Sequence, residues 1–287
     1  MPRELRWTSS GEPFAALTVG DDDATPVLCL HGFPDHPPSF VPFLEHLGAQ
    51  GFRGIAPWMR GYAPSTLRGP FDVDHLAGDV LALADTVAPG RRVGLVGHDW
   101  GAVVAYQALL RAPERFFAAV TLSVPHPVAF LRELVTAPAQ LRRSSYMVLF
   151  QLGPLADAIV KRNNFAFIER LVRAWSPSLD LPPADLAALK DCLRESMPSP
   201  LEYYRSIPRP LGAAMARVRA AAARPIVVPT LYLHGESDGC IRPGIAQRRY
   251  FAGPFEESLV HGAGHFLAME KPHVIGERAG SWLTRYR

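Results

Sequence analysis

Short apolar runs alternate with segments of helical periodicity in the first half of the chain. Runs with the length and composition of buried strands lie at 27–30, 52–57, 92–96 and 118–123. Between them, residues 74–87 and 102–110 carry apolar side chains at helical spacing. Strands that alternate with helices predict a mostly parallel sheet with helices on both faces.

This rhythm changes after Pro127. Residues 128–222 have a helical pattern without a clear strand, with amphipathic segments at 154–175 and 183–197. The pattern predicts a helical insertion of about ninety residues within an α/β fold.

Strand-like runs return at 226–233 and 257–260, and a final helix is expected at 273–286. We therefore expect an α/β core made of residues 1–127 and 223–287, with a helical cap at 128–222 between its two parts.

Composition narrows the class of protein. The 287 residues are 48% hydrophobic and 20% charged, with a formal net charge of +3, which is typical of a soluble globular protein. The balance does not indicate nucleic-acid binding, and no run approaches the ~18 apolar residues of a membrane span. The N-terminus lacks the apolar region of a signal peptide, so we expect a cytoplasmic protein, monomeric or homodimeric.

Three widely spaced cysteines, Cys29, Cys192 and Cys240, fit neither a disulfide framework nor a zinc site. We expect no metal.

The strongest chemical motif is Gly97-His98-Asp99-Trp100-Gly101, between a predicted strand and a predicted helix. This is the context of the nucleophile elbow G-x-S-x-G, with Asp99 in the serine position. The alternative is an ordinary strand-to-helix turn in which Asp99 caps the helix.

An aspartate nucleophile changes the chemistry that the elbow can perform. A carboxylate is already ionised at neutral pH, so it needs no base for its own attack. It can displace at an sp³ carbon and form an alkyl ester. Hydrolysis of that ester then requires a general base and an oxyanion hole.

Candidates for the base and its orienting acid follow the last strands. His265 lies after the last predicted strand, and His261 and His273 are weaker alternatives. Asp238 follows the preceding strand, with Glu236 as a competitor. The order nucleophile, acid, histidine matches that of hydrolases with this elbow.

Two backbone amides are candidates for the oxyanion hole. One belongs to Trp100, directly after the nucleophile, and the other to Phe33 in His31-Gly32-Phe33-Pro34. Pro34 is expected to fix this loop. A plain Gly-Pro turn would explain the loop but not its coincidence with the elbow.

Together these motifs resemble those of the α/β-hydrolase-fold epoxide hydrolases, over nearly the whole chain. The segments that carry the resemblance are HGFP (31–34), RGYAPS (60–65), GHDWGA (97–102), SVPHP (123–127), GESDG (235–239) and GAGH (262–265). The resemblance implies an epoxide substrate, a vicinal diol product and no cofactor.

The resemblance also implies that two tyrosines of the cap bind and protonate the epoxide oxygen. These positions match Tyr146 and Tyr204, with Tyr203 as a possible shift of register. Aromatic residues in a helical segment are also common in cores. Residues expected to contact substrate are His31, Pro34, Trp100 and Trp175.

Two other functions stay open. Haloalkane dehalogenases share the aspartate nucleophile and the following Trp, but they commonly carry Asn where this chain has Phe33; Trp175 could supply their second halide donor. A non-catalytic ligand-binding relative is the other alternative, because a fold does not fix a function. Such a protein could lose Asp99, Asp238 or His265 without penalty, so their joint presence favours an enzyme.

Overall fold

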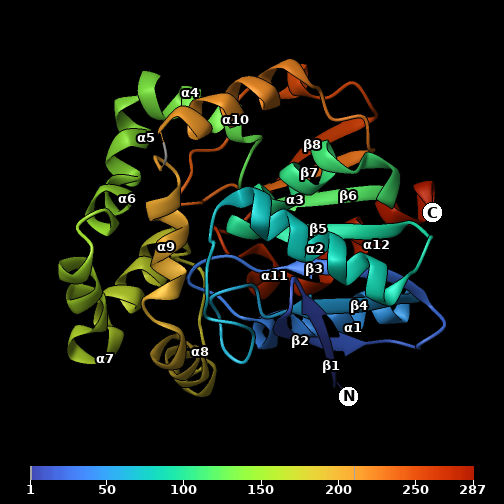
Figure 1. Cartoon of the computed structure of the whole chain (residues 1–287), viewed down its shortest axis with the longest axis horizontal. Helices are drawn as coiled ribbons and strands as arrows, with labels where there is room; N and C mark the ends of the chain where they lie inside the picture. Colours follow the sequence, from blue (N-terminus) through green and yellow to red (C-terminus); the bar gives the residue numbers. More distant parts are fainter. Residues whose placement is uncertain (1, 210) are drawn as a thin grey trace.

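A single sheet of eight strands forms the centre of the computed structural model, which describes residues 2–209 and 211–287 (Figure 1). The strand order is β1-β2-β4-β3-β5-β6-β7-β8. The strands are β1 (Arg3–Ser9), β2 (Glu12–Val19), β3 (Thr25–Leu30), β4 (Phe52–Pro57), β5 (Val93–His98), β6 (Phe116–Leu122), β7 (Thr230–Gly235) and β8 (Phe255–Val260).

Only one end of the sheet is antiparallel. There β2 pairs antiparallel with both β1 and β4, whereas all pairings from β4 through β8 are parallel. Every residue of β5, β6 and β7 is buried, as expected for parallel strands covered on both faces.

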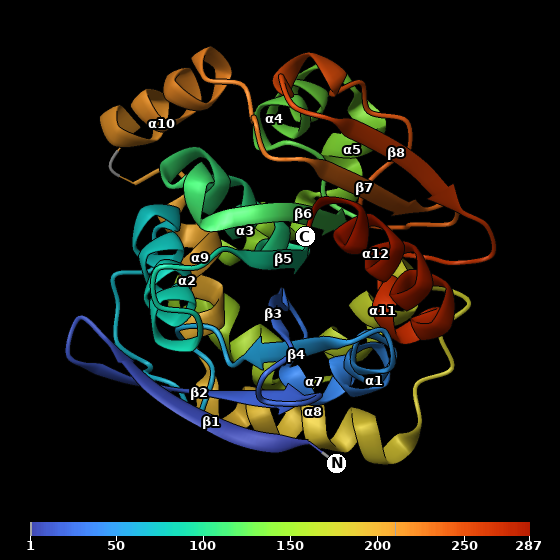
Figure 2. The same cartoon turned by 90° about the vertical axis from the view of Figure 1, so that its right-hand side faces the viewer.

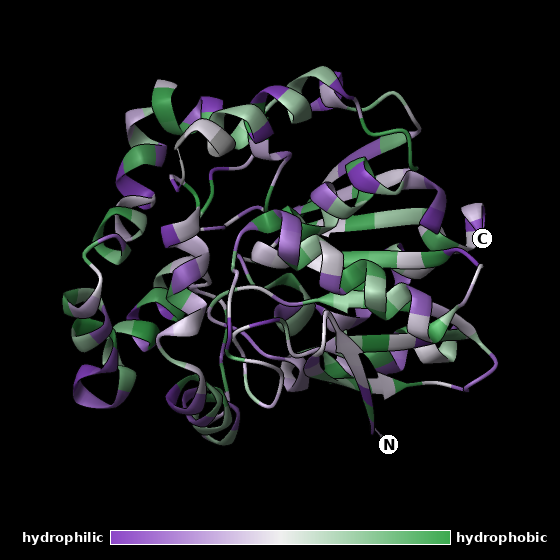
Figure 3. Cartoon of the chain, viewed as in Figure 1, coloured by the Kyte–Doolittle hydropathy of each residue, from purple (hydrophilic) through white to green (hydrophobic). Residues whose placement is uncertain are grey.

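Helices cover both faces of the sheet. Figure 2 shows α2 and α3 on one face and α1 and α12 on the other. The strands are coloured largely as hydrophobic in Figure 3, whereas the helices alternate between apolar and polar residues. The helices are α1 (Val41–Ala49), α2 (Val73–Val87), α3 (Trp100–Arg111), α4 (Pro127–Thr136), α5 (Pro138–Arg143), α6 (Ser145–Phe150), α7 (Pro154–Trp175), α8 (Pro183–Ser196), α9 (Ser199–Ser206), α10 (Leu211–Ala223), α11 (Leu267–Glu270) and α12 (Pro272–Tyr286), with short 3₁₀ turns at Pro37–Phe40, Pro113–Arg115 and Arg248–Tyr250.

The structure departs from the sequence pattern at two strands. The β1–β2 hairpin was not predicted from the sequence. Most residues of β1 are exposed or half-buried, and a strand of this kind carries no apolar run that would reveal it. The run expected at 226–233 becomes a strand only from Thr230, since Pro229 has no amide hydrogen to donate to a sheet. Before it, Ile226 forms only an isolated bridge with Phe251.

Helices α4 to α10 form the connection between β6 and β7 and lie along one side of the sheet (Figure 1). The amphipathic segment predicted at 154–175 is not one continuous helix: Arg162 has an extended ψ of 143°, and residues 163–165 have positive φ. We propose that residues 128–222 act as a cap over the core.

None of the helices in the described part of the chain has the length and apolar character that crossing a membrane requires.

The turn from β5 into α3 brings three backbone segments unusually close together. A Cβ added at Gly97 would lie 2.4 Å from the carbonyl oxygen of Gly101, and one at Gly101 would lie 2.2 Å from the carbonyl oxygen of Leu30. Between them, Asp99 has φ 52° and ψ −120°, a strained conformation for a residue with a side chain. The glycines allow this turn, and the turn carries Asp99.

Gly101→Ala should therefore lower the free energy of unfolding by about 2 kcal/mol, because the added methyl group meets backbone that cannot move aside easily. Gly212→Ala is the matched control, since a Cβ there meets nothing within 4 Å; its effect should stay within about 0.5 kcal/mol. Denaturant unfolding measures both. Equal effects would contradict the close approach.

Candidate active site

Three side chains from loops at the carboxyl edge of the sheet meet in one line. His265 Nε2 lies 3.4 Å from Asp99 Oδ2, and His265 Nδ1 lies 2.8 Å from Asp238 Oδ2. All three residues are buried. The sequence placed them after β5, β7 and β8, and the structure brings them together.

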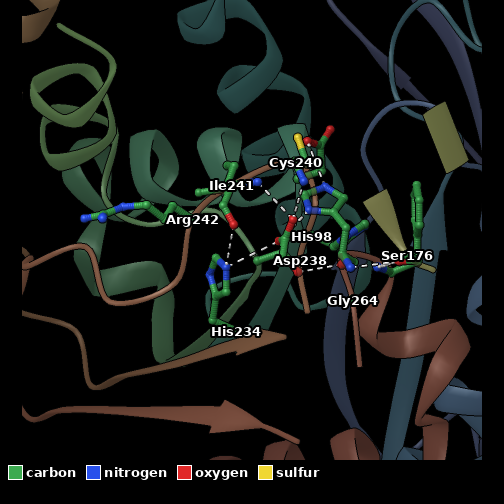
Figure 4. A network of polar contacts seen from close by, with 12 residues as sticks. His98, Ser176, His234, Asp238, Cys240, Ile241, Arg242 and Gly264 are labelled. Carbon is green, nitrogen blue, oxygen red and sulfur yellow. Dashed lines mark hydrogen bonds and ion pairs between the residues drawn. The ribbon is translucent and has the colours of Figure 1, made fainter. Parts of the chain in front are cut away.

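Asp238 is held on both of its carboxylate oxygens. Oδ1 accepts hydrogen bonds from the amides of Cys240 at 2.7 Å and Ile241 at 2.9 Å. Oδ2 faces His265 and also lies 3.4 Å from His234 Nε2 (Figure 4). Burial opposes ionisation of Asp238, but the neighbouring His265 outweighs it and lowers the pKa of this carboxyl. The acid is thus both fixed in position and ionised.

The position of His265 between two carboxyl groups controls its protonation. Burial by itself would lower the pKa of His265, but Asp238 and, to a smaller extent, Asp99 raise it to about 10. The imidazole is therefore protonated at neutral pH in the unreacted site.

Asp99 presents its two oxygens to different partners. Oδ1 accepts a hydrogen bond of 2.8 Å from the amide of Phe33, whereas Oδ2 faces His265. Asp99 occupies the N-cap position of α3, but its carboxylate makes no capping hydrogen bond to the helix. Trp100 begins α3, and the first amides of a helix have no intrahelical acceptor.

The loop that carries Phe33 approaches the elbow very closely. A Cβ added at Gly32 would lie 2.4 Å from Asp99 Oδ1 and 2.7 Å from the amide nitrogen of Trp100. The Phe33–Pro34 peptide is cis. The two amides predicted for an oxyanion hole therefore both lie beside the Asp99 carboxylate.

The weaker candidates lie elsewhere. His261 pairs with Glu236 at 3.1 Å, and both side chains are at least half exposed. The His273 ring packs against that of His46, with centroids 3.7 Å apart and the ring planes tilted by 47°. None of these groups contacts Asp99 in the structure.

Asp99 opens into a cavity of about 350 Å³ with mostly apolar walls. The walls come from α3, the loop after β6, and helices α4, α6, α9 and α10. Trp100, which was expected to contact substrate, lines this cavity, and so do Tyr146 and Tyr204. The other three residues expected to contact substrate are not among its described lining residues: His31, Pro34 and Trp175.

The two predicted tyrosines lie next to each other in this cavity, with ring centroids 5.7 Å apart. The Tyr204 hydroxyl is buried and has no hydrogen-bond partner among the described residues, while the Tyr146 hydroxyl lies 3.6 Å from Cys240 Sγ. Burial raises the pKa of both phenols well above the usual value. Both are therefore proton donors at neutral pH.

Tyr203 faces away from the cavity, and its hydroxyl donates to the backbone oxygen of Arg60. Of these two adjacent tyrosines, Tyr204 therefore lines the cavity and Tyr203 does not line it.

His31 and Trp175 lie outside the cavity lining and contact neighbouring segments of the chain. His31 Nε2 accepts a hydrogen bond of 3.2 Å from the amide of Met59, and burial lowers the pKa of the ring to about 4. The Trp175 ring packs 5.3 Å from that of His265, and its backbone oxygen accepts a hydrogen bond from the His265 amide.

Three residues that hold the His265 loop were not identified from the sequence. Ser176 Oγ accepts from the His265 amide at 2.8 Å. The backbone oxygen of His265 accepts from Ser123 Oγ at 2.6 Å and lies 2.9 Å from His98 Nε2. His98 and Ser123 lay inside the motifs GHDWGA and SVPHP, but neither received a role there; Ser176 lay outside the motifs and carried no sequence signal for this contact.

Within the described ranges, no three His, Cys, Asp or Glu side chains are grouped so that they could hold a metal ion.

Comparison with known proteins gives consistent matches. The model of the alpha/beta hydrolase family matches residues 27–278. Epoxide hydrolase A of Mycobacterium tuberculosis is 28% identical over 99% of this chain and 98% of its own length. Epoxide hydrolase 3 of Xenopus tropicalis is 27% identical, over 95% of this chain and 75% of that protein.

Solved structures agree on the fold. Epoxide hydrolase A from Mycobacterium thermoresistibile superposes with a TM-score of 0.83 at 22% identity, covering 100% of this chain and 99% of the other. The epoxide hydrolase of Bacillus megaterium gives 0.84 at 23% identity, covering 98% and 100%.

The relatives confirm the resemblance that the motifs indicated, and the family match spans most of the sheet together with the loops that carry Asp99, Asp238 and His265. With an α/β-hydrolase fold and a family match over most of its length, this chain belongs to the alpha/beta hydrolase family.

Proposed function

We propose that the protein hydrolyses epoxides to vicinal diols through an alkyl-enzyme ester on Asp99. The observation that carries this proposal is the pairing, in one apolar cavity, of the Asp99 carboxylate with the two protonated phenols of Tyr146 and Tyr204. An epoxide needs both a nucleophile at carbon and a proton for its oxygen. The names of the relatives support the same substrate class.

In the first step, Asp99 Oδ2 attacks a ring carbon and the carbon–oxygen bond of the epoxide breaks. The Phe33 amide holds Oδ1, which leaves Oδ2 as the free nucleophile. A proton from Tyr146 or Tyr204 neutralises the developing alkoxide. The products are an ester on Asp99, a hydroxyl on the neighbouring carbon and a tyrosinate.

In the second step, water attacks the carboxyl carbon of Asp99. His265 takes the proton of this water, and the amides of Phe33 and Trp100 stabilise the oxyanion. A hydroxyl proton of the tetrahedral intermediate passes to the departing alkoxide, so collapse releases the diol and restores the Asp99 carboxylate, while the proton taken from water leaves His265 as the imidazolium. No cofactor takes part in the proposed steps.

Alkylation itself prepares His265 for this role. The ester removes the negative charge of Asp99, which is one of the two charges that raise the pKa of His265. The pKa of the imidazole therefore falls when the ester forms, and the imidazolium proton passes to the tyrosinate left by ring opening, so that a neutral base is available for the second step. Asp238 continues to orient the ring through Nδ1.

The geometry favours an epoxide over a halide. A halide would need a second N–H donor beside Trp100, and the candidate Trp175 does not line the cavity within the described residues. Two phenols occupy that side of Asp99 instead, and a phenol can supply the proton that an epoxide oxygen requires.

His265→Gln should trap the ester, because loss of the base slows the second step by roughly 10²–10⁴-fold while attack by Asp99 continues. Intact-protein mass after brief exposure to an aryl epoxide should rise by the whole mass of the epoxide, and peptide mapping should place the adduct on Asp99. An aryl-alkyl bromide, tested in parallel, should give no adduct.

Asp99→Asn in the same background is the control and should give no adduct. An adduct only with the bromide, with release of bromide ion, would move the assignment to a dehalogenase. No adduct with either compound would contradict both enzymatic assignments.

Tyr146→Phe and Tyr204→Phe should each slow alkylation of Asp99 by about tenfold to a hundredfold, since the second phenol can still donate a proton. The double variant should lose at least about a thousandfold. Single-turnover kinetics separate this step from ester hydrolysis. Tyr203→Phe is the matched control and should leave alkylation unchanged; an equal effect of all three would contradict the assigned roles.

The pKa of His265 should fall from about 10 when either flanking carboxylate is neutralised. Asp238→Asn should lower it more than Asp99→Asn, because Asp238 contributes the larger interaction. Titration of the ring nitrogen resonances of labelled histidine by NMR measures both shifts. An unchanged pKa in Asp99→Asn would exclude activation of the base by alkylation.

A further inference from the structure

One polar side chain of the cavity has no partner and no part in the proposed chemistry. Besides Asp99 and the two tyrosines, the polar lining residues are Tyr106, Gln107, His126, Ser206 and Arg217. The hydroxyls of Tyr106 and Ser206 are hydrogen-bonded. The Gln107 amide bonds to Asp74 at 2.6 Å, and Arg217 lies 3.8 Å from the same carboxylate. Of these five side chains, only that of His126 has a buried polar atom, Nε2, without a hydrogen-bond partner among the described residues.

The proton of His126 is on this unpartnered nitrogen. His126 is the N-cap of α4, and its Nδ1 accepts a hydrogen bond from the Val128 amide at 3.3 Å. Burial lowers the pKa of the ring to about 4, so the ring is neutral. A neutral imidazole that accepts at Nδ1 carries its hydrogen at Nε2. His126 is therefore a hydrogen-bond donor without an acceptor.

Neighbouring residues fix the orientation of this donor. The His126 ring stacks on Tyr250, with centroids 4.5 Å apart and an interplanar angle of 8°, and the Tyr106 ring lies 5.5 Å away. The backbone amide of His126 donates to Gln247 Oε1 at 2.8 Å. A rigid, desolvated donor destabilises the protein unless a bound group accepts its hydrogen.

We propose that His126 Nε2–H is a specificity-determining donor for a neutral oxygen acceptor in the substrate, such as an ether or carbonyl oxygen distant from the reacting ring. The rest of the cavity wall near α4 and α10 is largely apolar, so a substrate that satisfies His126 carries one oxygen on an otherwise hydrocarbon body. The inference rests on the proposed function only in placing the reacting ring at Asp99.

An oxygen scan tests this donor. The compounds are a straight-chain terminal epoxide and analogues in which one ether oxygen replaces each chain methylene in turn. Binding is measured by calorimetry to Asp99→Asn, which cannot form the ester, and kcat/KM is measured with the wild-type enzyme. The analogue whose ether oxygen lies at the position that His126 reaches should bind about tenfold more tightly than the hydrocarbon parent.

Two substitutions at position 126 separate the donor from the cap. His126→Asn keeps an acceptor near Nδ1 for the Val128 amide but removes the donor at Nε2. His126→Gln keeps an amide donor near Nε2 but loses the cap. Both variants are made in the Asp99→Asn background. The tenfold tighter binding of the ether analogue should vanish in His126→Asn and persist in part in His126→Gln.

Several outcomes would overturn the inference. They are a flat scan, an advantage that survives His126→Asn, and equal losses in the two variants. A flat scan is the result expected if a water held between His126 and Gln247, whose side-chain nitrogen is also buried without a partner in the described residues, satisfies the donor. If the wild-type enzyme hydrolyses the hydrocarbon epoxide although the scan is flat, the proposed function stands and only the role of His126 is contradicted.

Discussion

A buried imidazole between two carboxylates is the constraint on which the site depends. Charges are costly inside a protein unless they are paired, and here Asp99, His265 and Asp238 compensate one another within a site whose three residues are almost completely excluded from solvent. In the proposed mechanism, loss of the Asp99 charge lowers the pKa of His265 and so couples the first step to the second. A serine nucleophile, neutral before attack, would not provide this coupling.

The position of His265 depends on the helical insertion as well as on the core. Its loop follows β8, but its amide bonds to Ser176 and to the backbone of Trp175 at the end of α7. The Tyr146 hydroxyl in turn contacts Cys240, whose amide bonds to Asp238. The acid, the base and one proposed proton donor are thus joined across the boundary between core and insertion, and a shift of the insertion would disturb all three.

The cavity combines an apolar body with a few placed polar groups. Burial within these walls disfavours the charged phenolate, which raises the pKa of Tyr146 and Tyr204 and keeps both protonated. The same walls leave His126 as a donor whose partner must come from whatever the cavity binds. The proposed reaction and the proposed selectivity therefore both depend on the burial of polar groups within largely apolar walls.

The sequence by itself determined the order of the core strands from β3 onward along the chain, the nucleophile elbow and the residue types of the proposed site, because glycine spacing and buried apolar runs are local properties. It also matched Tyr146 and Tyr204 through resemblance. The antiparallel hairpin, the break in α7 and the choice of Tyr204 over Tyr203 were decided only in the tertiary structure. So were the exclusion of His261 and Glu236, the positions of His31 and Trp175 outside the cavity lining, and the unpartnered His126. These depend on which distant segments pack together, and burial and hydrogen bonding between distant residues are not encoded in any short stretch of the chain.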